Sequence, residues 1–145
     1  MVLWMEAAVI FDEDDLHSAA LCAWKEARGD GEEACLAVLW VISNRCWDWS
    51  KSVHDVVYGK NQFSSMSVVA DPEYNLMPGA NDVMWTYCLG AAPSALNRDT
   101  DDPTKGSHYY WNPHTATSSW FSREIAGDAT NHPMRGEFGK QQFFA

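Results

Sequence analysis

Apolar residues recur with helical spacing in the first part of the chain. Steps of three and one residues separate Leu16, Ala19, Ala20, Ala23, Trp24 and Ala27. Such spacing places the apolar side chains on one face of a helix. The acids at positions 12–15 suit its start, because the N-terminal end of a helix favours negative charge. We therefore predict a helix from about Asp14 to Ala27, ended by the glycine-containing stretch 28–31.

A second helix is predicted from about Glu32 to Trp47. Positions 36–42 are all apolar, so this helix should be central and buried on every side. Asn44 and Arg45 then interrupt the apolar run. A buried polar pair would need partners, whereas an exit to the surface at the helix end would not. The sequence leaves both arrangements open.

The remaining elements are shorter. We predict a short helix or turn at 52–58, a helix at 81–89 ending at Gly90, an aromatic strand at 108–111, and a final strand or turn at 141–144. Polar, Gly- and Pro-containing stretches predict loops at 72–79, 97–106 and 128–139. The expected fold class is α+β and mainly α-helical, with a small β element. Its 145 residues suit a single domain, 1–145.

The acidic charge of the chain argues against two classes of function, nucleic-acid binding and electrostatic membrane anchoring. Ten basic residues against 20 acidic ones give a formal net charge of −10. A nucleic-acid-binding protein needs a basic surface, and an electrostatic membrane anchor needs basic residues too. We expect neither. Residues 1–10 are apolar but too few to cross a bilayer and carry no basic residue, so we expect no signal peptide and no membrane insertion.

The cysteine, acidic and histidine residues indicate neither a metal site nor a cofactor site. No two of the four cysteines, Cys22, Cys35, Cys46 and Cys88, form a C-x-x-C pair. We interpret them as buried free thiols, which fits synthesis in a reducing cytoplasm. The acidic loop at 99–102 lacks the glycine and glutamate of a calcium loop, and the histidines lack zinc-ligand spacing.

Glu26 is the first candidate for catalysis. It stands just before the break between the two predicted helices, where a glycosidase would hold a catalytic acid. A helix carries partial negative charge at its C-terminal end, which disfavours a second negative charge there. A neutral carboxylic acid can protonate the oxygen of a sugar leaving group.

Several short motifs together resemble the SleB-type cell wall hydrolases, a family that acts on the spore cortex and also occurs in bacteriophage lysis genes. The matching pieces lie in one order along residues 18–121: Glu26-Ala27-Arg28-Gly29-Asp30, Val41-Ile42-Ser43-Asn44-Arg45, Gln62-Phe63-Ser64, Asp102-Pro103-Thr104-Lys105-Gly106-Ser107, His108-Tyr109-Tyr110-Trp111-Asn112-Pro113 and Trp120. Each motif alone is weak, and their shared order makes the match specific.

Two positions depart from the family pattern. The last acid of the first motif is Asp30, with a shorter side chain than the family's glutamate, and Gln141 replaces the histidine of the C-terminal motif. We interpret that histidine position as structural or substrate-positioning.

The resemblance implies a lysozyme-like fold and cleavage of the β-1,4 bond between N-acetylmuramic acid and N-acetylglucosamine in bacterial peptidoglycan. The implied reaction is lytic transglycosylation, in which the muramic acid C6 hydroxyl attacks C1 and leaves a 1,6-anhydro product. Glu26 is the matching catalytic residue. Candidate substrate-binding residues are Arg28, Gln62, Ser64, Tyr109, Tyr110 and Trp111, and Asp30 is a possible second carboxylate.

The sequence also suggests a biological setting. A monomeric bacteriophage endolysin without a separate wall-binding domain would be made in the host cytoplasm. It would need a holin to permeabilise the membrane before it could reach the wall in the periplasm. The alternatives are a hydrolytic muramidase, an N-acetylmuramoyl-L-alanine amidase, and a non-catalytic peptidoglycan-binding virion module.

Overall fold

The computed structural model describes residues 11–145. Its elements, in chain order, are α1 (Glu13–Ala27), η1 (Arg28–Asp30), α2 (Glu32–Asp48), α3 (Val53–Tyr58), α4 (Ser64–Ser67), α5 (Val83–Asn97), β1 (Tyr109–Trp111), α6 (Ser119–Phe121), the π-helix η2 (Ser122–Ala126), β2 (Met134–Phe138) and β3 (Gln141–Phe144). The predicted α+β, mainly α-helical class is confirmed. The signal-peptide prediction concerns residues 1–10, which lie outside the described residues.

Helix α1 begins and ends as its sequence predicts. Asp12 accepts a hydrogen bond from the Asp15 backbone at 2.8 Å, and Asp15 accepts one from the Asp12 backbone at 3.1 Å. This capping box satisfies amide groups that the first helical turn leaves without partners. At the other end, Gly31 separates η1 from α2 with a φ of 97°, a conformation that side chains other than glycine rarely adopt.

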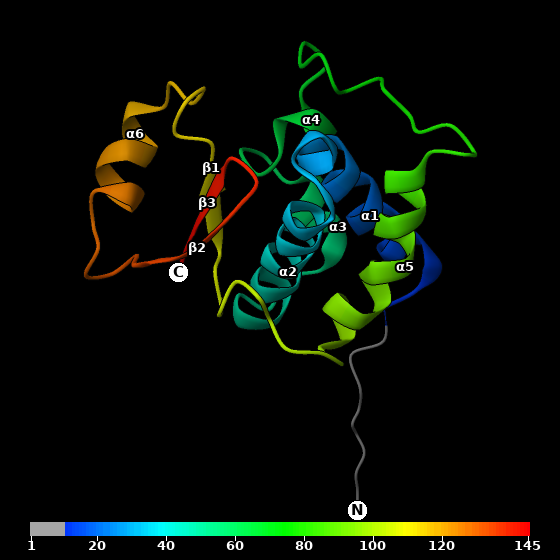
Figure 1. Ribbon diagram of the computed structural model, residues 1–145, viewed down its shortest axis with the longest axis horizontal. Coiled ribbons are helices and arrows are strands. Elements are labelled where there is room, and N and C mark those ends of the chain that lie inside the picture. Colours follow the sequence, from blue (N-terminus) through cyan, green and yellow to red (C-terminus); the bar gives the residue numbers. More distant parts are fainter. Residues whose placement is uncertain (1–10) are drawn as a thin grey trace, which may run out of the picture.

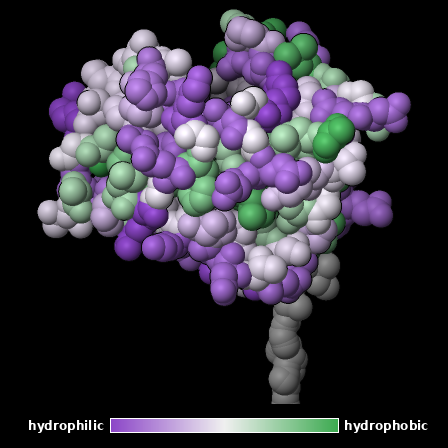
Figure 2. Space-filling view, viewed as in Figure 1, coloured by the Kyte–Doolittle hydropathy of each residue, from purple (hydrophilic) through white to green (hydrophobic). Residues whose placement is uncertain are grey.

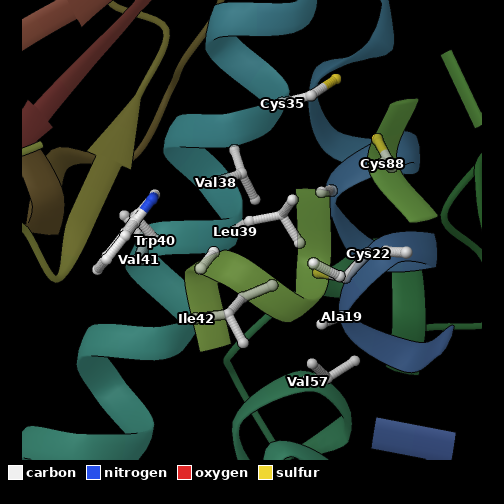
Figure 3. Close-up of a cluster of buried hydrophobic side chains, with 14 of the residues drawn as sticks. Ala19, Cys22, Cys35, Val38, Leu39, Trp40, Val41, Ile42, Val57 and Cys88 are labelled. Carbon is white, nitrogen blue, oxygen red and sulfur yellow. The ribbon is translucent and has the colours of Figure 1, made fainter. Parts of the chain in front are cut away.

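Helix α2 is buried on all sides, as its apolar run predicts. Figure 3 shows Leu39 and Ile42 pointing from α2 toward the other helices, whereas Trp40 and Val41 lie on the opposite side, toward the strands. All four are at most 2% exposed. The helical core packs α2 against α1 and α5, and the small sheet lies between α2 and the α6 segment (Figure 1). Burying α2 joins the two parts of the fold.

The sheet is antiparallel, with β3 between β1 and β2. Residues 141–144, predicted as a strand or turn, therefore form its central strand, and Phe143 is fully buried. The predicted loop at 128–139 is wrong in part, because it contains β2. This edge strand is polar and mostly exposed, with a register shift between Met134 and Gly136. Its own residues carry no strand pattern, and its pairing with β3 defines it.

Helix α5 corrects a second prediction. It continues through Gly90 and Pro93 to Asn97 instead of ending at Gly90. Cys88, Ala92, Ala95 and Leu96 bury one face of this helix completely. Packing of that face outweighs the low helix propensity of one glycine and one proline.

The other expectations about buried groups are settled by the structure. All four cysteines are free and buried, which confirms their interpretation as core thiols. Asn44 and Arg45 are buried, at 2% and 8% exposure, so α2 does not exit to the surface there. The face in Figure 2 intersperses hydrophobic and hydrophilic residues. Within residues 11–145, no helix is long and apolar enough to cross a membrane.

Two glycine substitutions should change stability in opposite directions. At the exposed, helical Gly90 an added Cβ would meet nothing within 4 Å. Gly90→Ala should therefore raise the free energy of unfolding by about 0.5–1 kcal/mol. Gly139 has a φ of +60°, and a Cβ there would lie 2.5 Å from the Asp30 Cβ. Gly139→Ala should therefore lower the free energy of unfolding by about 1–2 kcal/mol or more.

Urea unfolding monitored by circular dichroism measures both changes. A destabilised Gly90→Ala variant would contradict the continuous α5 helix.

Candidate functional site

Glu26 lies in the last turn of α1 and is half-buried. Hydroxyl groups from two distant elements reach its carboxylate. Ser65 of α4 donates to Oε2 at 2.6 Å, and the phenol of Tyr110, in β1, donates to Oε1. These two hydrogen bonds hold the carboxylate in one orientation.

Glu26 lines two hollows. The larger is a cleft of about 700 Å³ and the smaller has about 390 Å³. The cleft is lined by Glu26, Arg45, Trp49, Asn61, Gln62, Phe63, Ser64, Tyr109, Tyr110, Trp111, Asn112, Thr115, Ala116, Trp120, Phe121 and Gln141. The smaller hollow is lined by Lys25, Glu26, Arg28, Gly29, Asp30, Glu73, Asn112 and Lys140. Glu26 and Asn112 belong to both linings, so the two hollows lie on either side of a shared wall.

The three consecutive aromatic residues of β1 divide between two faces, as strand alternation predicts. Tyr110 stacks on Phe143 with ring centroids 5.3 Å apart and reaches Glu26. Trp111 faces the other way and stacks on Phe121 at 4.8 Å. The structure places Tyr110 on the side of the helices. All three aromatic residues line the cleft.

The proton of Tyr110 is strongly held. Burial raises the pKa of its phenol well above the usual range, and the neighbouring Glu26 raises this pKa further. A neutral phenol can donate to a carboxylate, whereas a phenolate cannot. Tyr110 therefore stays a hydrogen-bond donor to Glu26 at neutral pH.

Arg45 places a buried cation in the wall of the cleft. Its Nε donates to the His108 carbonyl at 2.8 Å, and one terminal nitrogen donates to the Gln62 side chain at 3.1 Å. The guanidinium also lies 5.2 Å from the Phe63 ring centroid and 5.3 Å from that of Trp49. Among residues 11–145 the structure gives it no carboxylate partner, and burial lowers its pKa.

The predicted residue Arg28 makes a two-point ion pair with Glu73, at 2.5 and 3.0 Å. The hydrogen bond to Glu73 raises the pKa of Arg28. Nearby, the buried Lys25 donates to the carbonyls of Ser65 and Tyr74, at 3.2 and 2.7 Å. Both cations thus tie the segment around α4 to the end of α1, and this segment carries Ser65 to Glu26.

Asp30, the possible second carboxylate, accepts a hydrogen bond from the Gln141 side chain at 3.0 Å. Gln141 is 9% exposed and also lines the cleft. The contact joins η1 to the β2–β3 turn, where Gly139 packs closely on Asp30. An amide at position 141 can make this contact without carrying charge.

The structure brings all the predicted site residues to the lining of one or both of the two hollows. Ser64 lines the cleft, but its hydroxyl donates to Asp71 at 2.5 Å. The hydroxyl that reaches Glu26 belongs to Ser65, which the sequence analysis missed. The Gln62-Phe63-Ser64 motif pointed to this segment, and only the turn of α4 decides which serine faces the carboxylate. Within residues 11–145, no group of three or more His, Cys, Asp or Glu is arranged to hold a metal ion.

The chain is similar to known proteins that degrade the bacterial cell wall. A profile of the cell wall hydrolase family matches residues 29–133, beginning just after Glu26. Spore cortex-lytic enzymes of Halalkalibacterium halodurans and Bacillus subtilis are each 31% identical to the chain over 112 residues, which is 76% of its length. The match covers 31% and 33% of these relatives, so the chain spans about a third of their length.

Two solved structures are similar over nearly the whole chain. One is the catalytic domain of the germination-specific lytic transglycosylase SleB from Bacillus anthracis, with a TM-score of 0.70 and 27% identity. That similarity covers 96% of this chain and all of the other. The second is the catalytic domain of the Bacillus cereus SleB protein, with a TM-score of 0.70, 26% identity, and coverage of 99% and 98%.

The raised pKa of Tyr110 predicts a loss of stability in alkali. Unfolding returns the phenol to its ordinary pKa of about 10, so the unfolded chain releases this proton at a lower pH than the folded protein does. The stabilisation is complete below about pH 10 and is lost as pH rises toward the higher folded pKa. The free energy of unfolding should therefore fall above about pH 10, and it should fall less steeply in Tyr110→Phe.

Urea unfolding at a series of pH values from 8 to 11 measures these slopes. Some decline should remain in the variant, because burial also raises the pKa of Tyr87 and raises that of Cys46 to about 12. Equal slopes in the two proteins would contradict the buried, neutral phenol.

Proposed function

The chain belongs to the cell wall hydrolase family and is of the SleB type, and on that premise we propose that it degrades bacterial peptidoglycan by lytic transglycosylation. The bond cut is the β-1,4 linkage between N-acetylmuramic acid and N-acetylglucosamine. One observation carries the proposal: Glu26, whose carboxylate is oriented by two hydroxyl groups, lines two neighbouring hollows. A glycan strand lying through both hollows would present a glycosidic oxygen to Glu26.

Glu26 acts first as an acid. Its proton passes to the glycosidic oxygen, the bond from that oxygen to C1 of muramic acid breaks, and positive charge develops on the sugar ring. The resulting carboxylate accepts hydrogen bonds from Ser65 and Tyr110. Hydrogen bonds to a charged acceptor are stronger than bonds to a neutral one, so both contacts strengthen as the proton leaves.

Glu26 then acts as a base. The C6 hydroxyl of the same muramic acid attacks C1, and its proton passes to the carboxylate. The 1,6-anhydro ring forms, and Glu26 regains the proton that it lost. One residue can serve both steps because they follow each other on one face of the sugar.

The other acids that line the two hollows favour this route over hydrolysis. Hydrolysis by the usual mechanisms needs a second free carboxylate, about 5–9.5 Å from the first. Among the described residues, the other acids in the lining are Asp30 and Glu73. Glu73 is paired with Arg28, and Asp30 is hydrogen-bonded to Gln141. Both are engaged in holding the walls of the site.

We also propose the setting of this activity. The four buried free thiols fit a protein made in a reducing cytoplasm. The proposed setting is that of a bacteriophage endolysin. Such a protein is made in the host cell, reaches peptidoglycan after a holin permeabilises the membrane, and lyses the cell.

The products test the reaction directly. Mass spectrometry of digested peptidoglycan should show muropeptides that end in 1,6-anhydromuramic acid. Glu26→Gln should lower the rate about 10²–10⁴-fold, the usual contribution of general acid–base catalysis, with unchanged circular dichroism. Glu124→Gln, at an exposed acid outside both hollows, is the matched control.

Other products would indicate a different activity. Reducing ends would indicate a muramidase, and amines freed by cleavage of the bond between muramic acid and its peptide would indicate an amidase. Binding to cell walls without any cleavage would indicate a virion module. An active Glu26→Gln variant would remove Glu26 from the mechanism.

The role of Ser65 can be tested separately. Ser65→Ala removes one donor to the Glu26 carboxylate and should lower kcat about 10- to 100-fold, since a hydrogen bond to a charged group contributes about 1.5–3 kcal/mol. KM should change little, because this contact does not involve the substrate. The matched control is Ser67→Ala in the same helix, whose hydroxyl donates only to the Phe63 carbonyl. Equal kcat values for the two variants would show that Ser65 does not assist Glu26.

A further inference from the structure

Trp120 is a large apolar side chain left open to solvent at the cleft. Its side chain is 54% exposed although it lines the same hollow as Glu26. Within residues 11–145, its aromatic neighbour is Phe121, with ring centroids 6.4 Å apart in an edge-on arrangement, and no aromatic ring stacks on the indole. Packing of the core does not require an exposed indole in the lining of the cleft that also holds Glu26.

The segment that carries Trp120 is firmly anchored. Phe121, the next residue, stacks on Trp111 with centroids 4.8 Å apart and meets Phe144 edge-on at 5.7 Å. Ile125, one turn later in the π-helix, is 3% exposed. These contacts join the α6–η2 segment to the sheet, and Figure 1 shows the segment beside the strands. The position of the Trp120 backbone is therefore set before any ligand arrives.

The residues around Trp120 are polar, which favours a ligand that has polar groups as well as an apolar face. The preceding residues, 115 and 117–119, carry exposed hydroxyl groups, and Asn61, Asn112 and Thr115 line the same cleft. An apolar partner would meet these polar groups without satisfying them. A β-1,4-linked hexosamine fits both properties, because its equatorial substituents leave apolar C–H faces on the ring and place polar groups at its edge.

We propose that Trp120 is a binding platform for one N-acetylhexosamine ring of the glycan strand, on the cleft side of the bond that is cut. This inference rests on the proposed function, since it takes the strand through the cleft past Glu26. Stacking on Trp120 occurs equally in the bound substrate and in the transition state. It therefore contributes to affinity and hardly at all to the chemical step.

The kinetic test uses a soluble strand of alternating N-acetylglucosamine and N-acetylmuramic acid freed of its peptides. Trp120→Ala should raise KM about three- to tenfold with kcat nearly unchanged. Trp120→Tyr keeps a flat ring and should recover most of the affinity. A KM equal to that of the wild type in Trp120→Ala, at full wild-type activity, would overturn the platform while leaving the proposed function intact.

A direct binding test uses the Glu26→Gln protein, which should not cleave the strand. Titration with the same strand, followed by the indole N–H signals in ¹⁵N NMR spectra, should shift the Trp120 signal, assigned by its loss in Trp120→Phe. The Trp47 signal serves as a control within the same sample. Its indole donates to the Leu96 carbonyl, and Trp47 lies outside both hollows.

The outcomes of the titration are distinct. A saturable shift of the Trp120 signal with an unmoved Trp47 signal supports the platform. A bound strand that leaves the Trp120 signal unmoved, or no binding at all, overturns it. Absence of cleavage by the wild-type protein under any condition would instead count against the proposed function.

Discussion

The carboxylate of Glu26 joins three parts of the chain that are far apart in sequence. Its hydroxyl partners lie 39 and 84 residues away, in α4 and β1. The site is therefore complete only when the end of α1, the segment around α4 and the sheet have all reached their places. Several contacts beside the site hold these parts together, including the hydrogen bonds of Lys25 to two carbonyls and the partly buried Arg28–Glu73 ion pair.

The central helix α2 gives the site its rigid wall. Its apolar middle is buried between the helices and the sheet, and its polar end supplies Asn44 and Arg45. Asn44 donates to the Asp102 carboxylate at 2.9 Å and to the Ser107 carbonyl at 3.0 Å, which holds the turn that leads into β1. Arg45 then binds the His108 carbonyl and Gln62. Two polar residues at the end of an apolar helix thus orient both sides of the cleft.

The errors of the sequence analysis have physical causes. Gly90 and Pro93 have low helix propensity, yet the buried face around Cys88 and Leu96 keeps α5 helical. Strand β2 has no pattern of its own because an exposed edge strand buries few side chains. Ser65 was missed in favour of Ser64 because the two neighbours differ only in direction. In a short helix that direction follows from packing and not from residue type.

By itself, the sequence determined the first two helices, the break between them, and the buried character of α2, because each depends on spacing within a few turns. The ordered motifs around Glu26 and the aromatic strand were likewise sufficient to indicate the family. Only the tertiary structure decided that Arg45 is buried, that Tyr110 faces Glu26, and that Trp120 is exposed in the lining of the same cleft as Glu26. Those outcomes depend on contacts between residues tens of positions apart, and no local pattern encodes which distant surface a side chain will meet.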